Sequence, residues 1–318
     1  MQRFAWEKMA NSKSSHSTLE SPVNFTFARH ETFHPRYGWL TKGFEKAREN
    51  GEIFVQPDAP VELGVGKNMV RSLRYWCRAF KLLEEDNTAS SRSRPASATL
   101  FGQQLLTQWD NFLENPASLW LLHWNLLKPT CDAATWYYTF NLFRGVEFTD
   151  ADLLDGLQRY QTQSEKTVAK NSLKKDISCL LRMYVEQTKK KTPLEDSIDS
   201  PFTELGLIQQ VGGSNRYRFR IGAKANLPPE IITAACLEYV QDRDTNNISL
   251  SHLLYDENSP GLVFKLTESA MYDALEQVSD NSEAITLSDS AGLIQFTFKG
   301  EPQELAKGIL EEYYTTVG

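Results

Sequence analysis

The sequence lacks any long uncharged apolar run, and its mean hydropathy over 318 residues is −0.45. It therefore predicts no membrane-spanning helix, and residues 1–22 lack the apolar centre of a signal peptide. Cysteine is scarce, and the spacing of about fifty residues between successive cysteines excludes zinc-ligand and redox motifs. These absences predict a cytoplasmic protein with buried thiols in a reducing compartment. The cysteines are Cys77, Cys131, Cys179 and Cys236.

Acidic residues outnumber basic ones, and the formal net charge of −7 by itself argues weakly against a nucleic-acid ligand. The distribution changes that interpretation, because 15 acidic and 4 basic residues fall between Glu238 and Gly318. That stretch has a net charge of −11. Because the whole chain has a net charge of −7, residues 1–237 have a net charge of −7 + 11 = +4. An acidic end can bind a partner protein or keep the chain soluble, and the sequence leaves both open. The basic residues concentrate in 65–81, 166–191 and 216–224.

The most informative segment is 66–81, which follows a glycine-containing turn. Apolar residues recur at three- and four-residue spacing from Val70 to Phe80, so one face of the predicted helix is mostly apolar. The other face carries only basic charge, because the segment contains no acid. A helix with one face in a core and arginines on the other fits the DNA major groove. Residues 64–67 (GVGK) resemble the end of a phosphate-binding loop, but Asn68 stands where that motif requires Ser or Thr.

Periodicity and capping residues predict the other elements. Helices are expected at 39–50 and 115–128, the second nearly all apolar and capped by Asn115. Residues 23–30 alternate in a β-like way, and a turn is expected near Asn171–Ser172. Further helices are expected at 227–242, at 248–255 and within 259–279, before a closing helix at 304–314.

The order of these elements is that of a winged helix. In 148–225 two helices and a basic helix precede a hairpin with Gly212 and Gly213 in its turn. A similar order recurs towards the C-terminus with fewer basic residues, and there the hairpin is expected at 284–300. In the first unit, the polar segment 87–97 suits the tip of a wing. The predicted fold class is mainly α with small β-hairpins (α+β), in tandem winged-helix-like units. The predicted divisions are a disordered tail at 1–22, an N-terminal unit with buried aromatic helices at 23–147, a second unit at 148–225 and an acidic unit at 226–318.

A single basic helix is usually just a solvated face, but basic helices in two successive units and a basic wing favour double-stranded DNA as a ligand. Lysines are expected to neutralise phosphates, whereas Asn68 and Arg71, early in their helix, are better placed for base edges. The candidate DNA-binding residues are Lys67, Asn68, Arg71, Arg74, Lys170, Lys174, Lys175, Arg216 and Arg218.

Two groups of residues are candidates for chemistry. His30 to His34 match the zinc-protease pattern H-E-x-x-H, but that site needs a helix, and Pro35 disfavours helical backbone at His34. His30 and Glu31 can instead be an acid/base pair or buried polar residues. Asp196 and Asp199 lie beside the basic stretch and can hold Mg²⁺ or Mn²⁺, although helix caps or a solvated turn explain them equally well.

Seven segments together resemble a bacterial family long described only as a domain of unknown function. The family includes SspB-like proteins of single-strand DNA phosphorothioation systems. The resemblance runs in order from about Phe25 to Tyr314, and the family pattern keeps His-Glu-Thr-Phe and Arg-Tyr-Gly-Trp but no second His at position 34. The segments are FARHETFHPRYGWLTKGFEKA, LGVGKNMVRSLRYW, PASLWLLHWNLL, TWYYTFNLF, SLKKDISCLLRMYV, LEDSIDSPFTELGLI and SPGLVFKL.

The resemblance implies a nickase that opens one DNA strand so that partner sulfur-transfer and ATPase proteins can insert sulfur. By motif position it implies His30 and Glu31 for the chemistry and Arg29 or Arg36 near the scissile phosphate, with Asp196 and Asp199 as metal ligands. The sequence has no common nuclease signature. The rival hypotheses are therefore a non-catalytic DNA-binding scaffold and a winged-helix transcription regulator, and the oligomeric state is open.

Overall fold

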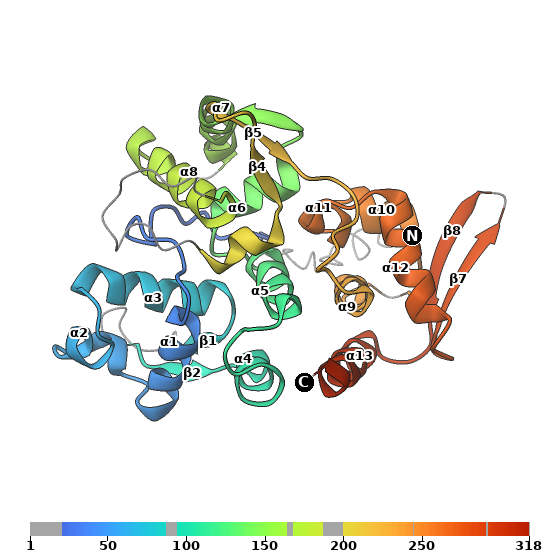
Figure 1. The fold of residues 1–318 in the computed structure, drawn as a ribbon, viewed down its shortest axis with the longest axis horizontal. Helices are drawn as coiled ribbons and strands as arrows, with labels where there is room; N and C mark the ends of the chain where they lie inside the picture. Colours follow the sequence, from blue (N-terminus) through green and yellow to red (C-terminus); the bar gives the residue numbers. More distant parts are fainter. Residues whose placement is uncertain are drawn as a thin grey trace, which may run out of the picture.

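The computed structural model describes residues 21–86, 94–163, 168–186, 200–243, 245–290 and 292–317. Most of these residues are helical, and the strands form three small antiparallel sheets, which confirms the predicted α+β class (Figure 1). The predicted disordered tail lies outside the described residues except for Ser21 and Pro22. No helix in the described ranges is long and apolar enough to cross a membrane.

The N-terminal part is a group of helices followed by a two-stranded hairpin. The basic helix expected at 66–81 is α3, and the helix expected at 115–128 is α5, with the Asn115 side chain capping its first turn. The hairpin flanks the predicted wing tip, whose residues 87–93 are outside the described ranges. The elements are α1 (Trp39–Glu49), η1 (Ile53–Val55), α2 (Ala59–Glu62), α3 (Lys67–Ala79), β1 (Leu83–Glu85), β2 (Ala96–Ala98), α4 (Leu100–Gln104), η2 (Leu105–Trp109), α5 (Pro116–Leu127), α6 (Ala134–Tyr137) and η3 (Tyr138–Leu142).

The middle part places two helices against a three-stranded sheet. Thr149 starts the first helix with a capping box, in which its hydroxyl accepts from Asp152 N–H and the Asp152 carboxylate accepts from Thr149. The glycines of the predicted hairpin turn, Gly212 and Gly213, both have positive φ, which fits their expected role. The elements are β3 (Glu147–Thr149), α7 (Asp150–Tyr160), η4 (Gln161–Gln163), α8 (Lys170–Tyr184), η6 (Pro201–Leu205), β4 (Ile208–Gln210) and β5 (Arg216–Phe219).

The C-terminal part repeats that plan and ends in a long helix. The hairpin expected at 284–300 is present, and it projects from the body of the molecule (Figure 1). The elements are α9 (Pro229–Val240), β6 (Asn247–Ser249), α10 (Leu250–Tyr255), α11 (Pro260–Phe264), α12 (Glu268–Ser279), β7 (Ile285–Ser290), β8 (Leu293–Phe298) and α13 (Pro302–Val317).

Each of the two larger sheets gains a third strand that the sequence pattern did not indicate. The sheet orders are β3-β5-β4 and β6-β8-β7, so a three-residue strand before the first helix pairs with the last strand of each hairpin. Residues 248–255 were therefore wrongly expected to be all helix, because Ile248 and Ser249 pair with β8. Three residues are too few to give a periodicity, and only the partner strand decides their conformation.

Two other local predictions are also wrong. Residues 23–30 form no strand, and their only bridge joins Val23 to Cys131. Asn171 and Ser172 lie inside the first turn of α8 and not in a turn between helices. A helix start and a turn have similar sequences, because both favour polar side chains that form hydrogen bonds with backbone groups.

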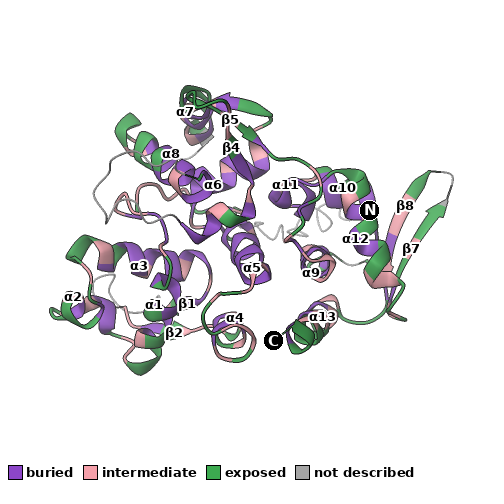
Figure 2. Cartoon of the chain, in the orientation of Figure 1, coloured by how far each residue is buried: buried purple, intermediate pink, exposed green. Residues whose placement is uncertain are grey.

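Helix α5 is the centre of the molecule and is buried along almost its whole length (Figures 1 and 2). His123 in this helix joins the three parts of the chain. Its Nδ1 accepts from the Tyr184 hydroxyl at 2.8 Å, and its Nε2–H donates to the Val263 carbonyl at 3.0 Å. Burial lowers the pKa of His123 to about 3, so the ring is neutral and keeps both hydrogen bonds.

We predict that His123→Ala lowers the free energy of unfolding by about 3 kcal/mol, because it leaves a cavity and two unpaired buried polar groups. Urea denaturation measures this loss. The matched control is His252→Ala, since that ring is exposed and its removal should change stability by less than about 0.5 kcal/mol. Equal effects of the two substitutions would contradict the central role of His123.

Two buried lysines lie where the middle and C-terminal parts meet. The Lys224 ammonium donates to the carbonyls of Gly222, Phe264 and Lys265 at 2.6–2.7 Å. The Lys265 ammonium donates to the Phe140 carbonyl at 2.7 Å and lies 4.5 Å from the centre of the Phe219 ring. Burial lowers the pKa of each lysine to about 7.

Because the unfolded chain binds protons at these lysines up to about pH 10.5, their neutral form favours the folded state at alkaline pH. The free energy of unfolding should therefore rise between pH 7 and pH 9, and Lys265→Met should reduce that rise by about 1 kcal/mol or more. Urea titrations at the two pH values measure both slopes. Lys307→Met is the control, because Lys307 is exposed and should leave the slope unchanged.

Candidate nucleic-acid interface

The segment 28–33 is a tight loop that carries the His-Glu-Thr-Phe motif. Ala28, Glu31 and Thr32 all have positive φ, at 55°, 49° and 71°. Such backbone is unfavourable for residues with a side chain, so the surrounding contacts must hold it. The motif lies in turns and not in a helix, as expected from the proline at position 35.

The Asp176 carboxylate on α8 is the main holder of this loop. Its Oδ1 accepts from Ala28 N–H at 2.8 Å and from His30 Nε2–H at 2.7 Å, and its Oδ2 accepts from the Thr135 hydroxyl at 2.7 Å. The other ring nitrogen of His30 accepts from Thr32 N–H at 3.1 Å. Both His30 nitrogens are therefore bonded, and the side chain of Asp176 is nearly fully buried.

Helix α3 holds the loop from the other side. The Ser72 hydroxyl and the Trp76 indole N–H both donate to the Phe33 carbonyl, at 3.2 and 2.9 Å. Arg182 on α8 donates to the Thr32 carbonyl at 2.6 Å. The loop therefore fixes α3 and α8 relative to each other.

The four residues expected to perform chemistry are not equally accessible. His30 is only 1% exposed and packs beside the rings of Trp76 and Trp136, so it positions the loop in this structure. Arg29 is exposed, and Glu31 is partly exposed with its carboxylate 3.7 Å from Arg71. The Arg36 guanidinium lies over the rings of Phe33 and Trp39, at 5.8 and 5.4 Å.

The basic face of α3 is divided by ion pairs. Arg74 bonds to Glu85 at 2.8 Å, and Arg78 bonds to Glu85 and Asp132 at 3.4 and 3.1 Å. The start of the helix is different, because Lys67 and Asn68 are exposed and the Arg71 side chain is 57% exposed. Among the predicted contacts on α3, these three are the accessible ones.

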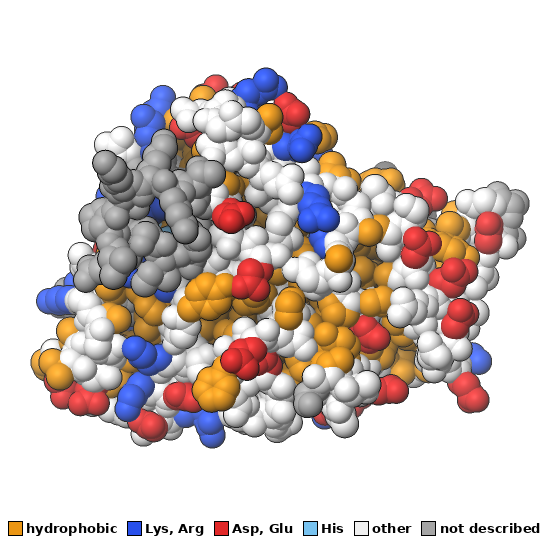
Figure 3. Space-filling model, viewed as in Figure 1, with side chains coloured by type: hydrophobic (Ala, Val, Ile, Leu, Met, Phe, Trp, Pro, Cys, Tyr) orange, Lys and Arg blue, Asp and Glu red, His pale blue; other side chains and the backbone are white. Residues whose placement is uncertain are grey.

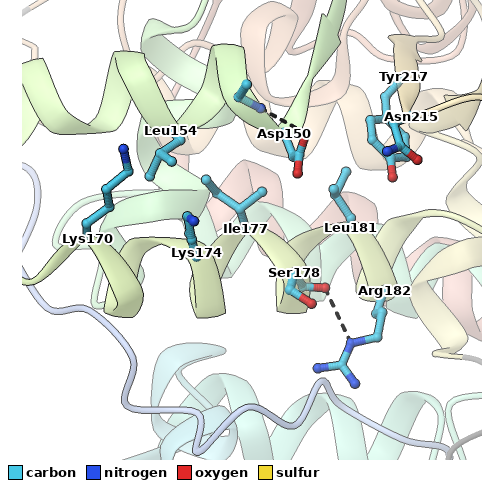
Figure 4. Close-up of a pocket in the computed structure, with 11 residues that line it drawn as sticks. Asp150, Leu154, Lys170, Lys174, Ile177, Ser178, Leu181, Arg182, Asn215 and Tyr217 are labelled. Atoms are coloured by element: carbon cyan, nitrogen blue, oxygen red, sulfur yellow. Dashed lines mark hydrogen bonds between the residues drawn. The ribbon is translucent and has the colours of Figure 1, made fainter.

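A groove of about 490 Å³ lies between α7, α8 and β5. Lys170, Lys174, Ser178 and Arg182 follow one another every fourth residue along α8, so they share one face of the helix. Lys170 and Lys174 lie at one end of the groove, and Asn215 and Tyr217 lie at the other (Figure 4).

The middle of the groove is mainly apolar. Leu154, Ile177 and Leu181 lie between the two ends, and Asp150 projects towards them from the start of α7 (Figure 4). Burial raises the pKa of the Tyr217 phenol, so it remains protonated at neutral pH. Lys175 is exposed on α8 but does not line the groove.

The hairpin arginines lie on the outer face of the middle sheet. The side chains of β5 alternate, so Arg216 and Arg218 are exposed while Phe219 is buried. Arg216 bonds to Glu147 at 2.7 Å, and Arg218 is the register partner of Glu147 on β3. Glu147 reduces the positive charge of this face, but an exposed ion pair of this kind is weak in water.

The predicted metal ligands Asp196 and Asp199 lie outside the described residues. Within the described ranges no group of three His, Cys, Asp or Glu side chains could hold a metal ion.

The surface charge follows the division seen in the sequence. On the face shown in Figure 3, the part that contains α10, α12, β7 and β8 carries mainly acidic side chains, whereas most basic side chains lie over the other parts, together with some acids. A second groove, between α12 and the β7–β8 hairpin, is lined by Glu268, Asp273 and Asp289. Its charged side chains are therefore acidic, whereas those of the α8 groove are mainly basic.

Several site residues were not indicated by motif reasoning, namely Asp176, Arg182, Asn215 and Tyr217. The sequence does contain an indication that Asp176 is unusual, because it falls on the apolar face that Leu173, Ile177 and Leu180 form on α8. An acid on a buried face requires a partner. The partner itself could not be identified, since His30 is 146 residues away.

The model of the family "Protein of unknown function (DUF4007)" matches residues 27–314. The crystal structure of magnesium ion-bound SspB superposes with a TM-score of 0.87 at 38% identity, and a second SspB crystal structure gives 0.85 at 39%. Each comparison covers 93% of this chain and 90% of the SspB chain.

This chain belongs to the SspB-like family. The resemblance drawn from the seven segments is thereby confirmed over nearly the whole length. No curated protein matches the chain.

We predict that Asp176→Ala lowers the free energy of unfolding by about 3–5 kcal/mol, because it removes three hydrogen bonds from buried donors. Hydrogen exchange of residues 28–34 should accelerate in the same variant. Asp155→Ala is the control, because Asp155 is exposed on α7. An unchanged exchange rate in Asp176→Ala would show that the loop is held by other contacts.

Proposed function

We propose that this SspB-like protein is a cytoplasmic DNA-binding component of a bacterial DNA phosphorothioation system. The observation that carries the proposal is the lysine-lined groove of α8, joined through the 28–33 loop to the exposed start of α3. Two accessible basic helix faces on one rigid support suit a polyanion. The phosphorothioation role rests on the family, as do the sulfur-transfer and ATPase partners.

The middle and C-terminal parts are proposed to be winged helices, and the N-terminal part a reduced version of one. The support is their element order, in which a strand, helices and a hairpin follow one another with the outer strand paired to the last one. In such a unit α8 is the recognition helix and the β4–β5 hairpin is the wing. The acidic C-terminal unit is then unsuited to DNA, which favours a protein partner there.

Nicking of one strand is proposed as the activity of this family member. The support is the bound magnesium ion of the SspB relative and the accessible Glu31 and Arg29 beside the basic helices. Asp196 and Asp199 are the carboxylates that would hold Mg²⁺ or Mn²⁺, the cations that oxygen ligands suit. Glu31 would accept the proton of the attacking water while arginine stabilises the added negative charge.

DNA binding is tested by the salt dependence of affinity. The double variant Lys170→Gln, Lys174→Gln should weaken binding to duplexes of any sequence and lower the slope of log K against log salt by about two. Fluorescence anisotropy measures both quantities. The control is Lys299→Gln, Lys307→Gln in the acidic part, which makes the same change in charge, and an equal loss there would contradict the assigned surface.

Nicking is tested with supercoiled plasmid in Mg²⁺, Mn²⁺ or EDTA. We expect metal-dependent open circles that disappear in Asp196→Asn and fall by about 100-fold or more in Glu31→Gln. Asp155→Asn is the control for the loss of one carboxylate. Intact plasmid together with salt-sensitive binding would instead favour the non-catalytic scaffold or the transcription regulator.

A further inference from the structure

The groove between α7, α8 and β5 holds more kinds of side chain than a phosphate needs. A DNA backbone segment requires cations and hydrogen-bond donors, which Lys170 and Lys174 supply. The far end instead has an aromatic ring and a side-chain amide, with an apolar stretch between the two ends (Figure 4). This sequence of phosphate binder, apolar wall, aromatic ring and amide matches the parts of a nucleotide.

The size of the groove agrees with that occupant. Its volume of about 490 Å³ lies within the range of about 300–1,000 Å³ that is usual for small-molecule sites. The apolar walls belong to residues that are fixed in the core, since Leu154 and Leu181 are each 8% exposed and Ile177 is 3% exposed. The groove is therefore formed before any ligand arrives.

The aromatic end is also fixed in position. Tyr217 pairs with Phe148 on one side and Gln210 on the other, and its ring lies 5.9 Å from that of Phe148. Asn215 is exposed at the hairpin turn, and Asp150 is exposed at the start of α7. An amide and a carboxylate beside an aromatic ring can read the edge of a stacked base, and a carboxylate accepts from an exocyclic amino group.

We propose that this groove receives one nucleotide swung out of a DNA duplex, with its base against Tyr217 and its phosphates at Lys170 and Lys174. The inference rests on the proposed DNA binding and adds the state of the bound DNA. Asp150 and Asn215 then favour bases that carry an amino group. A duplex backbone lying unbroken across the groove is the competing arrangement, and it would leave Tyr217 without a base.

The test compares two duplexes. In one a 2-aminopurine is bulged out without a partner, and in the other the 2-aminopurine is paired. An extrahelical base is already unstacked, so the protein should bind the bulged duplex about tenfold more tightly than the paired one at the same salt concentration. The 2-aminopurine emission should also change on binding. Tyr217→Leu should abolish the preference, whereas Tyr217→Phe, which keeps the ring, should retain it.

Lys175→Ala is the matched control, because it lowers the charge of α8 outside the groove and should weaken both duplexes equally. Equal affinity of the unsubstituted protein for the two duplexes would overturn the inference while leaving DNA binding intact. A preference that survives both Tyr217→Leu and Asn215→Ala would also overturn it, since the base would lie elsewhere. Binding of neither duplex would instead overturn the proposed function.

Discussion

The contact on which the rest of this structure depends is the buried hydrogen bond between His30 and Asp176. It joins a loop of strained backbone to the inner face of α8, and the same carboxylate also accepts from Thr135 in a third segment. A buried carboxylate is stable only when its lone pairs are occupied, so these segments must assemble together. The outer face of α8 is oriented as a consequence, and that face carries the lysines of the groove.

The resulting arrangement separates positioning from contact with a ligand. His30 is the most conspicuous residue of its motif, but it lies inside, where it orders the loop that presents Arg29 and Glu31. Among the basic residues of helices α3 and α8, Lys67, Arg71, Lys170 and Lys174 reach solvent near the helix starts, whereas Arg74 and Arg78 further along α3 are paired with acids. Positive charge on α3 is thus concentrated at its start, where Arg71 lies beside Glu31 of the loop, and reduced further along the helix.

The acidic C-terminal part completes an electrostatic gradient along the molecule. Its groove between α12 and the β7–β8 hairpin is lined by acids, whereas lysines line one end of the groove of the middle part. A polyanion is attracted to one and repelled by the other, which would orient DNA on the protein. Helix α5 and the buried Lys224 and Lys265 hold the two charge regions together through hydrogen bonds to backbone carbonyls.

The sequence by itself determined the longer elements and the family. The apolar spacing of α3, the Asn115 cap of α5 and the glycines of the β4–β5 turn are local signals, and each element lies where they indicate. Tertiary structure alone decided the three-residue strands β3 and β6, the burial of His30, and the groove that brings Tyr217 to α8. These features depend on contacts between residues far apart in the chain, and no periodicity or cap encodes such a contact.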